Sequence, residues 1–332
     1  MTMLNKFTLF FINEAKGWPT WWQNLPRRKK LSPVLLVLLF WGVSWILGGL
    51  LTDHIFLGLI ILALSYGGKS ARIILHFILP VILTAIVYDS QKYYKDLLQG
   101  TIHVRFPYEF DKRLFGIETA SGRLTPNEWW QLHLNPVLDL VCGFFYLFFI
   151  AIYISICAWH RFFLPYRQKD PVLRNRAEKL GPLTTWAFFW LNVLGYSTYY
   201  WFPAAPPWYV AKFGLGPADL TALPDPAGCI RFDEILGTHF FTSMYSKSAN
   251  IFGAIPSLHI SYPALAMLFA FQLKSLRAFS VIFYVTMCFS AVYLNHHYIL
   301  DVIWGSAYAL LIWWWVNLYA NTKTTRELSD LK

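Results

Sequence analysis

The sequence predicts an all-α protein, a polytopic membrane helix bundle with about eight transmembrane helices and both termini in the cytoplasm. Composition is the first indication: 56% of the 332 residues are hydrophobic and only 14% are charged, whereas soluble domains carry about 25% charged residues. The apolar residues also gather in runs that are long enough to cross a bilayer. The basic residues stand in short turns between these runs, which gives the predicted orientation.

Each predicted transmembrane helix corresponds to one apolar run, because about 17–25 such residues cross the hydrocarbon core. The longer runs lie at 33–51, 72–89, 136–158, 183–203, 258–275, 277–295 and 299–319. A shorter run at 54–67 is ambiguous, since by itself it also fits a re-entrant segment. Only if it crosses the membrane do all the basic turns fall on one side, so we expect eight helices.

Five basic turns set this orientation, because Lys and Arg in short loops mark the cytoplasmic side. They lie at 27–30, 69–72, 161–180, 274–277 and 323–326. Two long segments, 90–135 and 204–257, then face outward. Both are rich in aromatic residues, and long ordered loops usually carry function.

The net charge of +10 raises the question of a nucleic-acid partner. The basic residues form no single patch, however, and they are better explained as topology signals and contacts with anionic lipids. We therefore expect a membrane environment and no nucleic acid. Residues 1–30 carry aromatics among polar positions and are predicted to lie on the membrane surface. A single transmembrane domain at 31–320 and a cytoplasmic tail at 321–332 follow.

The segment Gly253–His259 combines a helix start with an imidazole. Pro256 and Ser257 are helix-start signals, and the apolar run behind them supplies the helix. A helix start presents free N–H groups and the positive end of the helix dipole, which suits a phosphate. His259 then lies in the first turn, at the outward surface of the membrane.

A second imidazole motif is the segment Asn295–Asp301, Asn-His-His-Tyr-Ile-Leu-Asp. His297 and Asp301 are four residues apart and share one face of a helix. The carboxylate can then hold one imidazole nitrogen and leave the other for a substrate, which makes His297 a better nucleophile or base. His296 is five residues from Asp301 and points elsewhere, so we favour His297.

The predicted topology brings His259, His297 and Asp301 to the same membrane face. A lone histidine at a helix end is commonly only a polar residue, and an aspartate at a helix start is commonly a cap. Asp301, however, lies inside an apolar run, where an ionisable residue is costly and indicates function. Two histidines and one aspartate also fit zinc, but no HExxH motif or Cys cluster supports a metal site. We expect no metal or nucleotide cofactor.

These motifs resemble the type-2 phosphatidic acid phosphatase superfamily, which carries a P-S-x-H element and a later S-R-x5-H-x3-D element. Pro256–His259 matches the first element and Ser290–Asp301 the second. The resemblance implies a six-helix core in which His297 attacks phosphorus and forms a phosphohistidine, Asp301 orients it, and His259 protonates the leaving oxygen. Two elements differ: Ala291 replaces the expected Arg, and the family's early K-x6-R-P motif has no match.

The chain is more similar to one branch, the inositol phosphorylceramide synthases and their bacterial relatives. Residues 202–209 resemble that branch's F-P-x-x-P-P-W-Y element, and residues 252–259 resemble its F-G-A-x-P-S-L-H. Residues 295–298 resemble its H-H-Y element, in which the Arg is also absent, and Asp111 with Leu114–Gly116 resembles a D-x-x-L-F-G element. The resemblance spans about residues 100–315, the expected core of the catalytic domain.

The resemblance implies a membrane lipid phosphotransferase that moves phosphoinositol from phosphatidylinositol onto a ceramide-like acceptor, although the loops alone leave other head groups open. A lipid phosphatase acting on phosphatidic acid or a lipid pyrophosphate would use the same histidines, with water as the acceptor. A non-enzymatic transporter or scaffold is a third alternative. The intramembrane charges are too few and too clustered at one face for an obvious transport path.

Substrate contacts are expected from the outward segments and from the two histidine motifs. The candidate substrate-binding residues are Ser257, Tyr298, Arg113, Arg105, Lys247, Trp208 and Tyr209. We expect the site to face the periplasm of a bacterial inner membrane, or the Golgi lumen in a eukaryotic cell.

Overall fold

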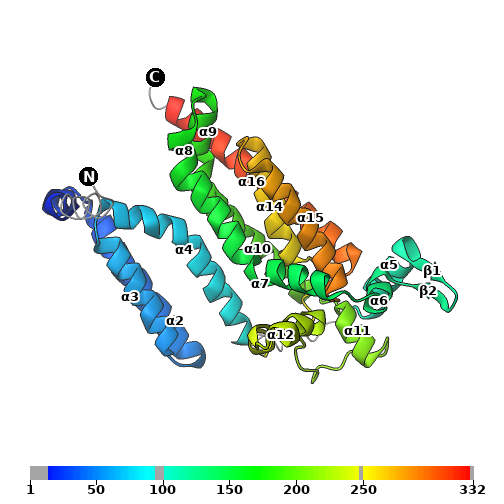
Figure 1. The fold of residues 1–332 in the computed structure, drawn as a ribbon. Coiled ribbons are helices and arrows are strands. Elements are labelled where there is room, and N and C mark those ends of the chain that lie inside the picture. Colours follow the sequence, from blue (N-terminus) through cyan, green and yellow to red (C-terminus); the bar gives the residue numbers. More distant parts are fainter. Residues whose placement is uncertain (1–13, 94–100, 247–249, 330–332) are drawn as a thin grey trace. The chain divides into compact units, whose positions relative to one another are not determined.

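The computed structural model describes residues 14–93, 101–246 and 250–329. The chain is mostly helical and groups into two compact units, Met1–Ile86 and Val87–Lys332 (Figure 1). The predicted Lys247 lies outside the described residues, as do the first thirteen residues of the predicted surface segment and the last three of the predicted tail. The second unit carries both histidine motifs.

The first unit contains a helical hairpin of α2 (Arg27–Gly48) and α3 (Thr52–Tyr66), which are joined through Gly49 at a φ of 92°. The two helices pack closely because Gly58 has no side chain. A Cβ atom at Gly58 would lie 2.5 Å from the ring of Trp41. The Trp41 indole N–H also donates to the carbonyl of His54 at 2.8 Å. The border between the units falls within the next helix, α4 (Lys69–Ser90).

The second unit holds short elements from the two long segments and the helices of the bundle. The segment 90–135 holds α5 (Arg105–Phe115), β1 (Ile117–Thr119), β2 (Gly122–Leu124) and α6 (Pro126–Gln131). The next helices are α7 (Pro136–Ala158), α8 (Leu164–Arg167), α9 (Pro171–Leu180) and α10 (Thr184–Trp201). The segment 204–257 holds α11 (Pro207–Phe213), α12 (Ile230–Leu236) and α13 (Phe240–Tyr245). The chain closes with α14 (Leu258–Gln272), α15 (Arg277–Tyr293) and α16 (Ile299–Ser329).

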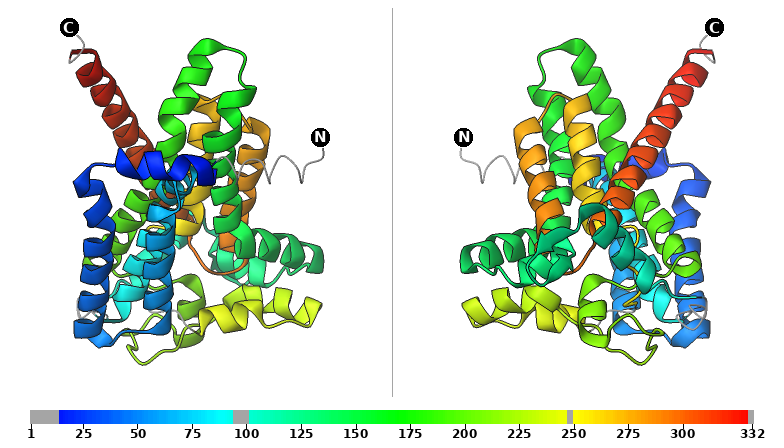
Figure 2. Two further views of the ribbon diagram at one scale, coloured as in Figure 1. Left: turned by 90° about the vertical axis from the view of Figure 1, so that its left-hand side faces the viewer. Right: turned by 90° about the vertical axis from the view of Figure 1, so that its right-hand side faces the viewer.

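Helix α14 lies at the centre of the bundle, where it contacts α7, α10, α15 and α16 (Figures 1 and 2). Its side chains Ile260, Leu265 and Ala270 have no exposed surface. Such all-round burial explains why this segment is apolar on every face. The contact with α16 is tight, since a Cβ atom at Gly305 would lie 2.4 Å from the carbonyl oxygen of Ser257. The start of α14 is therefore fixed against the first turns of α16.

Four described helices are long and apolar enough to cross a membrane: Arg27–Gly48, Lys69–Tyr93, Pro136–Arg167 and Ile299–Thr322. Three further apolar helices are shorter: Thr52–Tyr66, Leu258–Gln272 and Arg277–Tyr293. Large apolar side chains are exposed on the outside of the second unit, among them Ile282, Val285 and Trp314. Such surfaces are stable in lipid and unfavourable in water. The chain is therefore an integral membrane protein, while eight crossings with cytoplasmic termini stay a prediction.

A short hairpin departs from the all-α prediction. Strands β1 and β2 pair antiparallel, with Ile117 opposite Leu124, and Gly122 adopts a φ of 114° at the turn. A glycine tolerates this backbone conformation without steric cost, which favours a reversal of the chain here. The prediction missed it because each strand is only three residues long, too short to show an alternating pattern.

Three outward segments far apart in the sequence run side by side. Ala204 forms parallel bridges with His103 on one side and with Gly253 on the other. The Ala204 N–H donates to the carbonyl of Phe252 at 2.8 Å, and the Ala254 N–H donates back to Ala204 at 3.3 Å. These bonds fix the residues that directly precede Pro256 and the start of α14.

Candidate active site

The first histidine motif forms the start of α14, as predicted. Ser257 is the N-cap residue, yet its hydroxyl makes no capping bond and is buried without a hydrogen-bond partner. Its backbone N–H instead donates to the carbonyl of Asp301 at 3.1 Å. The hydroxyl of Ser261, one turn later, donates to the carbonyls of Ser257 and Gly305. The two motifs are thus joined through the backbone, and the Ser257 hydroxyl is left available.

The second motif forms a tight turn between α15 and α16. Asn295 adopts a φ of 61°, and the N–H groups of His296 and His297 both donate to the carbonyl of Ala291, at 3.1 and 3.0 Å. His297 therefore precedes α16 by two residues. The prediction placed His297 and Asp301 together on a helix, which is wrong in detail because the helix begins only at Ile299. The expected contact forms nevertheless, from a turn that folds back over the first helical residues.

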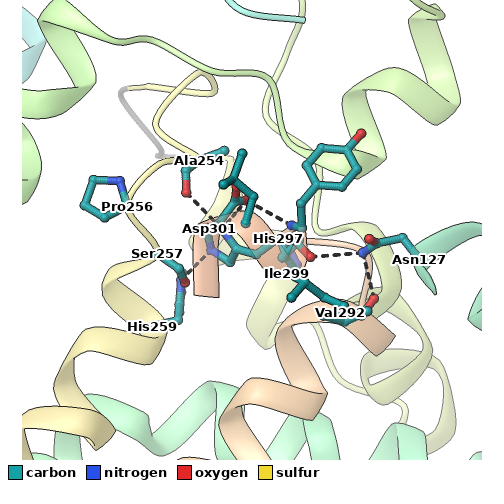
Figure 3. Close-up of polar contacts among 12 residues, drawn as sticks. Asn127, Ala254, Pro256, Ser257, His259, Val292, His297, Ile299 and Asp301 are labelled. Carbon is teal, nitrogen blue, oxygen red and sulfur yellow. Dashed lines mark hydrogen bonds and ion pairs between the residues drawn. The ribbon is translucent and has the colours of Figure 1, made fainter. Parts of the chain in front are cut away.

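Asp301, His297 and His259 form a continuous chain of polar contacts. Nδ1 of His297 lies 3.2 Å from Oδ2 of Asp301, and Nε2 of His297 lies 3.2 Å from Nδ1 of His259. The carbonyl oxygen of Ala254 lies 3.1 Å from the same Nδ1 of His297 (Figure 3). The structure thus brings together the three predicted catalytic residues from two separate motifs.

These contacts decide which nitrogen of His297 carries the proton. Nδ1 faces two acceptors, Ala254 and Asp301, so the hydrogen-bond network assigns its hydrogen to Nδ1. Nε2 then keeps its lone pair. Burial lowers the pKa of His297 to about 4, which keeps the ring neutral at pH 7. A neutral imidazole with a free Nε2 is the form that can attack an electrophile.

His296, the neighbouring histidine, takes a different position. Its Nε2 lies 3.0 Å from the carbonyl of Pro226 and 3.3 Å from Sγ of Cys229. Its ring stacks against those of Tyr146 and Tyr245, at centroid distances of 5.1 and 4.9 Å. These contacts turn it away from Asp301, in agreement with the choice of His297 from the spacing.

The rings that pack against His259 were not identified from the sequence. Tyr146 of α7 stacks on His259 with ring centroids 4.3 Å apart and planes 16° apart, and Phe149 lies 4.6 Å away. Both lie in an aromatic-rich apolar run, so nothing in their spacing distinguishes them from lipid-facing residues. They hold the imidazole of His259 from the side of α7.

The predicted hydrogen-bond donors and cations differ in placement. Tyr298 is buried and its hydroxyl has no hydrogen-bond partner, as with Ser257, while its N–H donates to Oδ2 of Asp301 at 2.9 Å. Arg105 and Arg113 are exposed on α5, and Arg105 pairs with Glu109 at 3.8 Å. Among the described residues, neither arginine forms a hydrogen bond with the histidine pair. Their role in binding substrate stays a prediction.

Comparison with known proteins identifies the family to which the two histidine motifs belong. The family model described as the PAP2 superfamily matches residues 114–315, which include both histidine motifs and Asp301. The chain belongs to the PAP2 superfamily. The resemblance inferred from the motifs is thereby confirmed. No solved structure matches the chain.

Curated relatives place the chain more narrowly within the PAP2 superfamily. The phosphoinositol dihydroceramide synthase of Bacteroides thetaiotaomicron is 31% identical over 295 residues, which cover 87% of this chain and 92% of that protein. The inositol phosphorylceramide synthase of Candida albicans is 38% identical over 165 residues, 48% of this chain and 35% of that protein. The catalytic subunit of the inositol phosphorylceramide synthase of Schizosaccharomyces pombe is 36% identical over 134 residues, which cover 40% of this chain and 32% of that protein.

The P-P-W-Y element lies beside the PAP2 motifs as a packed support. Trp208 and Tyr209 are buried with Phe252 in one apolar cluster. The Trp208 N–H donates to the carbonyl of Asn295 at 3.1 Å, and the Tyr209 hydroxyl accepts from the N–H of Asp219 at 2.6 Å. Trp208 therefore stabilises the turn next to His296 and His297, Tyr209 supports the segment at Asp219, and a direct contact of either residue with substrate stays a prediction.

One cation near the site was not identified from the sequence. Arg231 of α12 has a side chain that is only 17% exposed, and its Nε donates to Asp139 at 2.6 Å. Its Nη2 is buried without a hydrogen-bond partner. Burial and the neighbouring His297 lower the pKa of His296 to about 3, and the charge of Arg231 acts in the same direction. Nη1 of Arg231 donates to Gln131 at 3.3 Å and its guanidinium lies over the ring of Tyr293, so Nη2 is the part of this cation left for a ligand.

Among the described residues, no group of three or more His, Cys, Asp and Glu side chains is arranged to hold a metal ion. The site offers two imidazoles, a carboxylate and unpaired hydroxyl groups.

Proposed function

We propose that this protein is a lipid phosphotransferase that moves phosphoinositol from phosphatidylinositol onto a ceramide-like acceptor. The observation that carries the proposal is the contact of 3.2 Å between Nδ1 of His259 and Nε2 of His297, with Asp301 behind His297. The relative from Bacteroides thetaiotaomicron, a phosphoinositol dihydroceramide synthase, supports this choice of reaction.

The first step forms a phosphohistidine. Nε2 of His297 attacks the phosphorus of the donor lipid, and the bond from phosphorus to the diacylglycerol oxygen breaks. His259 acts here as an imidazolium, which the negative charge of the bound phosphodiester stabilises: its Nδ1 proton moves to that oxygen, so diacylglycerol leaves as a neutral alcohol and the ring of His259 becomes neutral. Asp301 accepts a hydrogen bond from Nδ1 of His297 and stabilises the positive charge that develops on the ring. The head group then remains bound to His297 through phosphorus.

The second step reverses the roles. His259, now without that proton, takes the proton of a ceramide hydroxyl, and the resulting oxygen attacks phosphorus. The bond between phosphorus and Nε2 of His297 breaks, which returns both imidazoles to their first state. The balance is one phosphodiester exchanged for another, and no external energy source is required.

Phosphate binding is assigned to buried donor atoms that have no protein partner, and to the start of α14. The hydroxyls of Ser257 and Tyr298 are buried and unpaired, and a buried donor without a partner is costly unless a ligand completes it. The N–H groups at the start of α14 add a positive dipole end. Arg231 supplies a full charge through its unpaired Nη2.

Burial of the site favours a lipid acceptor over water. His297 is 6% exposed and Asp301 is fully buried, so bulk water has little access to the phosphohistidine. A lipid phosphatase is the second candidate, since the PAP2 superfamily motifs suit hydrolysis equally well. Ala291 in place of the arginine argues against it, because a phosphomonoester carries a second negative charge that needs more cations.

The proposed membrane topology determines the side on which the site lies. Eight crossings with both termini in the cytoplasm place the histidine pair at the outer membrane surface, in the periplasm or in a lumen. Residues 14–26, the described part of the predicted surface segment that precedes α2, then lie on the cytoplasmic surface, and α16 ends on the same side. Both lipids reach the site laterally, within the outer leaflet.

The decisive experiment incubates the purified protein in lipid with head-group-labelled phosphatidylinositol, with and without ceramide, beside a His297→Ala control. Label on ceramide that requires intact His297 supports the transferase. Water-soluble labelled phosphate released with or without ceramide would point to a hydrolase instead. Hydrolysis of phosphatidic acid without any transfer would identify the lipid phosphatase.

A further inference from the structure

Asp111 is a buried carboxylate that binds the start of the helix carrying Asp301. Its Oδ2 accepts from the N–H of Ile299 at 2.7 Å, and its Oδ1 accepts from the N–H of Leu300 at 3.0 Å. Asp111 belongs to α5, 188 residues earlier in the chain, and has no exposed surface. The first N–H groups of a helix have no partner within the helix. Here they are satisfied by a residue from a distant outward segment.

Asn127 of α6 makes an equivalent contact on the other side of the turn. Its Nδ2 donates to the carbonyl of Val292 at 3.0 Å and to the carbonyl of His297 at 3.0 Å. It therefore joins the end of α15 directly to the main chain of His297 (Figure 3). Asn127 is 1% exposed, so water cannot easily replace these bonds.

Asp111, Asn127 and Asp301 each bind different polar groups of the turn. Oδ2 of Asp301 already accepts from the N–H of Tyr298 and faces Nδ1 of His297. Because Asp111 takes the next two helical N–H groups, Asp301 is not drawn away as an ordinary N-terminal cap. The carboxylate of Asp301 stays directed at His297.

The turn itself needs outside support. Asn295 has a positive φ, and two consecutive N–H groups share the single carbonyl of Ala291. Both features cost free energy, and such a backbone persists only where the surroundings determine it. Asp111 and Asn127 hold the two ends of the segment Val292–Leu300, in which His297 lies.

We propose that Asp111 and Asn127 are positioning residues, which align Nε2 of His297 for attack on phosphorus without touching the substrate. The proposal rests on the proposed function. It gives the D-x-x-L-F-G element a physical role, because Asp111 is its first residue. It also gives α5 and α6 a role in supporting the nucleophile, through these two side chains alone.

The test compares variants that keep the shape of each side chain. Asp111→Asn replaces one acceptor by a donor that faces an N–H, and Asn127→Asp replaces the donor by acceptors that face two carbonyls. The matched control is Glu109→Gln, the same change of acid to amide on an exposed residue of α5. The readouts are kcat and KM for transfer of labelled phosphoinositol, and the binding stoichiometry of a fluorescent phosphatidylinositol analogue as a count of folded protein.

We expect kcat per folded molecule to fall by roughly 10- to 100-fold in either variant, since a misplacement of about 1 Å costs about 10²-fold in rate. KM and the binding stoichiometry should stay within about twofold, because the lipid contacts remain. Glu109→Gln should behave as the wild type. A kcat that falls only in proportion to folded protein would show a purely structural role and overturn the proposal, as would an unchanged kcat.

The outcome is separable from the proposed function. If the wild type transfers no phosphoinositol, the transferase proposal fails. The same variants are then measured on phosphatidic acid hydrolysis, which also requires an aligned His297. Loss of kcat at constant KM in that reaction still supports the positioning role, and unchanged kcat still overturns it.

Discussion

Nε2 of His297 lies 3.2 Å from Nδ1 of His259 and therefore faces the residue that we propose as the general acid. Without substrate, these two ring nitrogens are hydrogen-bond partners of one another. A phosphodiester must come between them, which gives the nucleophile one side of phosphorus and the acid the other. Each imidazole thus has one assigned task that a variant can remove separately.

His297→Ala removes the proposed nucleophile. We expect transfer to fall below detection, because the variant lacks the imidazole that faces Asp301 and carries a free Nε2. A phosphohistidine is labile in acid and stable in base. After incubation with labelled donor, the variant should carry no label with these properties. The measurement is protein-bound label after rapid denaturation at high pH, and label on the variant at the wild-type level would exclude His297 as the attacked residue.

His259→Ala removes the proposed acid and base while it leaves the nucleophile intact. With phosphatidylinositol we expect a fall of about 10²–10⁴-fold, the range typical of general acid–base catalysis. A donor whose alcohol is already a good leaving group, such as a nitrophenyl phosphodiester, needs no protonation. It should label His297 in this variant and then stall. Equal impairment with both donors would contradict the assigned role.

The profile of kcat against pH should show two ionisations on its acidic side. Burial raises the pKa of the Asp111 carboxyl to about 7, and the charge of Asp301 acts in the same direction. As the pH falls through this value, protonation removes one acceptor from the start of α16, so kcat should decline toward the level of Asp111→Asn. A second, complete loss follows near pH 4, where His297 gains a proton and loses its lone pair.

Asp111→Asn should keep only the lower of these two steps, since it carries no carboxyl to titrate. The measurement is kcat from about pH 8 to pH 4 for the wild type and this variant. Two superimposable profiles would show that Asp111 does not act on the turn through its ionised form.

Arg231→Gln tests the buried cation of α12 that is assigned to phosphate binding. We expect KM for phosphatidylinositol to rise about tenfold or more, since a charge-assisted hydrogen bond contributes about 1.5–3 kcal/mol. Asp139→Asn is the control, because it weakens the pair of 2.6 Å and keeps the arginine charge. A rise in KM of the same size in both variants would indicate that Arg231 acts through the fold alone.

Gly305→Ala tests the close approach of α14 and α16. The added Cβ would lie 2.4 Å from the backbone oxygen of Ser257, and a backbone atom cannot move aside as a flexible side chain can. We expect a lower melting temperature and a loss of activity even though no polar group is removed. Gly216→Ala is a suitable control, because a Cβ there meets no atom within 4 Å. Wild-type stability in Gly305→Ala would contradict the tight contact.

The sequence determined the membrane helices and the two histidine motifs. Apolar runs and basic turns are local properties, so 258–275 and 277–295 predicted α14 and α15 closely. The pairing of His297 with Asp301 was also readable, because four residues of chain limit how far apart two side chains can lie. The family resemblance then gave each of these residues a role that the contacts now make testable.

Only the tertiary structure decided how the site is held together. Asp111 binds the N–H groups of Ile299 and Leu300 across 188 and 189 residues, and Arg231 reaches Asp139 from a different helix. No spacing or periodicity encodes such contacts, since they depend on how the outward segments fold over the bundle. The sequence therefore identified the groups that we propose to react, whereas their alignment depends on long-range hydrogen bonds to backbone atoms, which leave no pattern in the sequence.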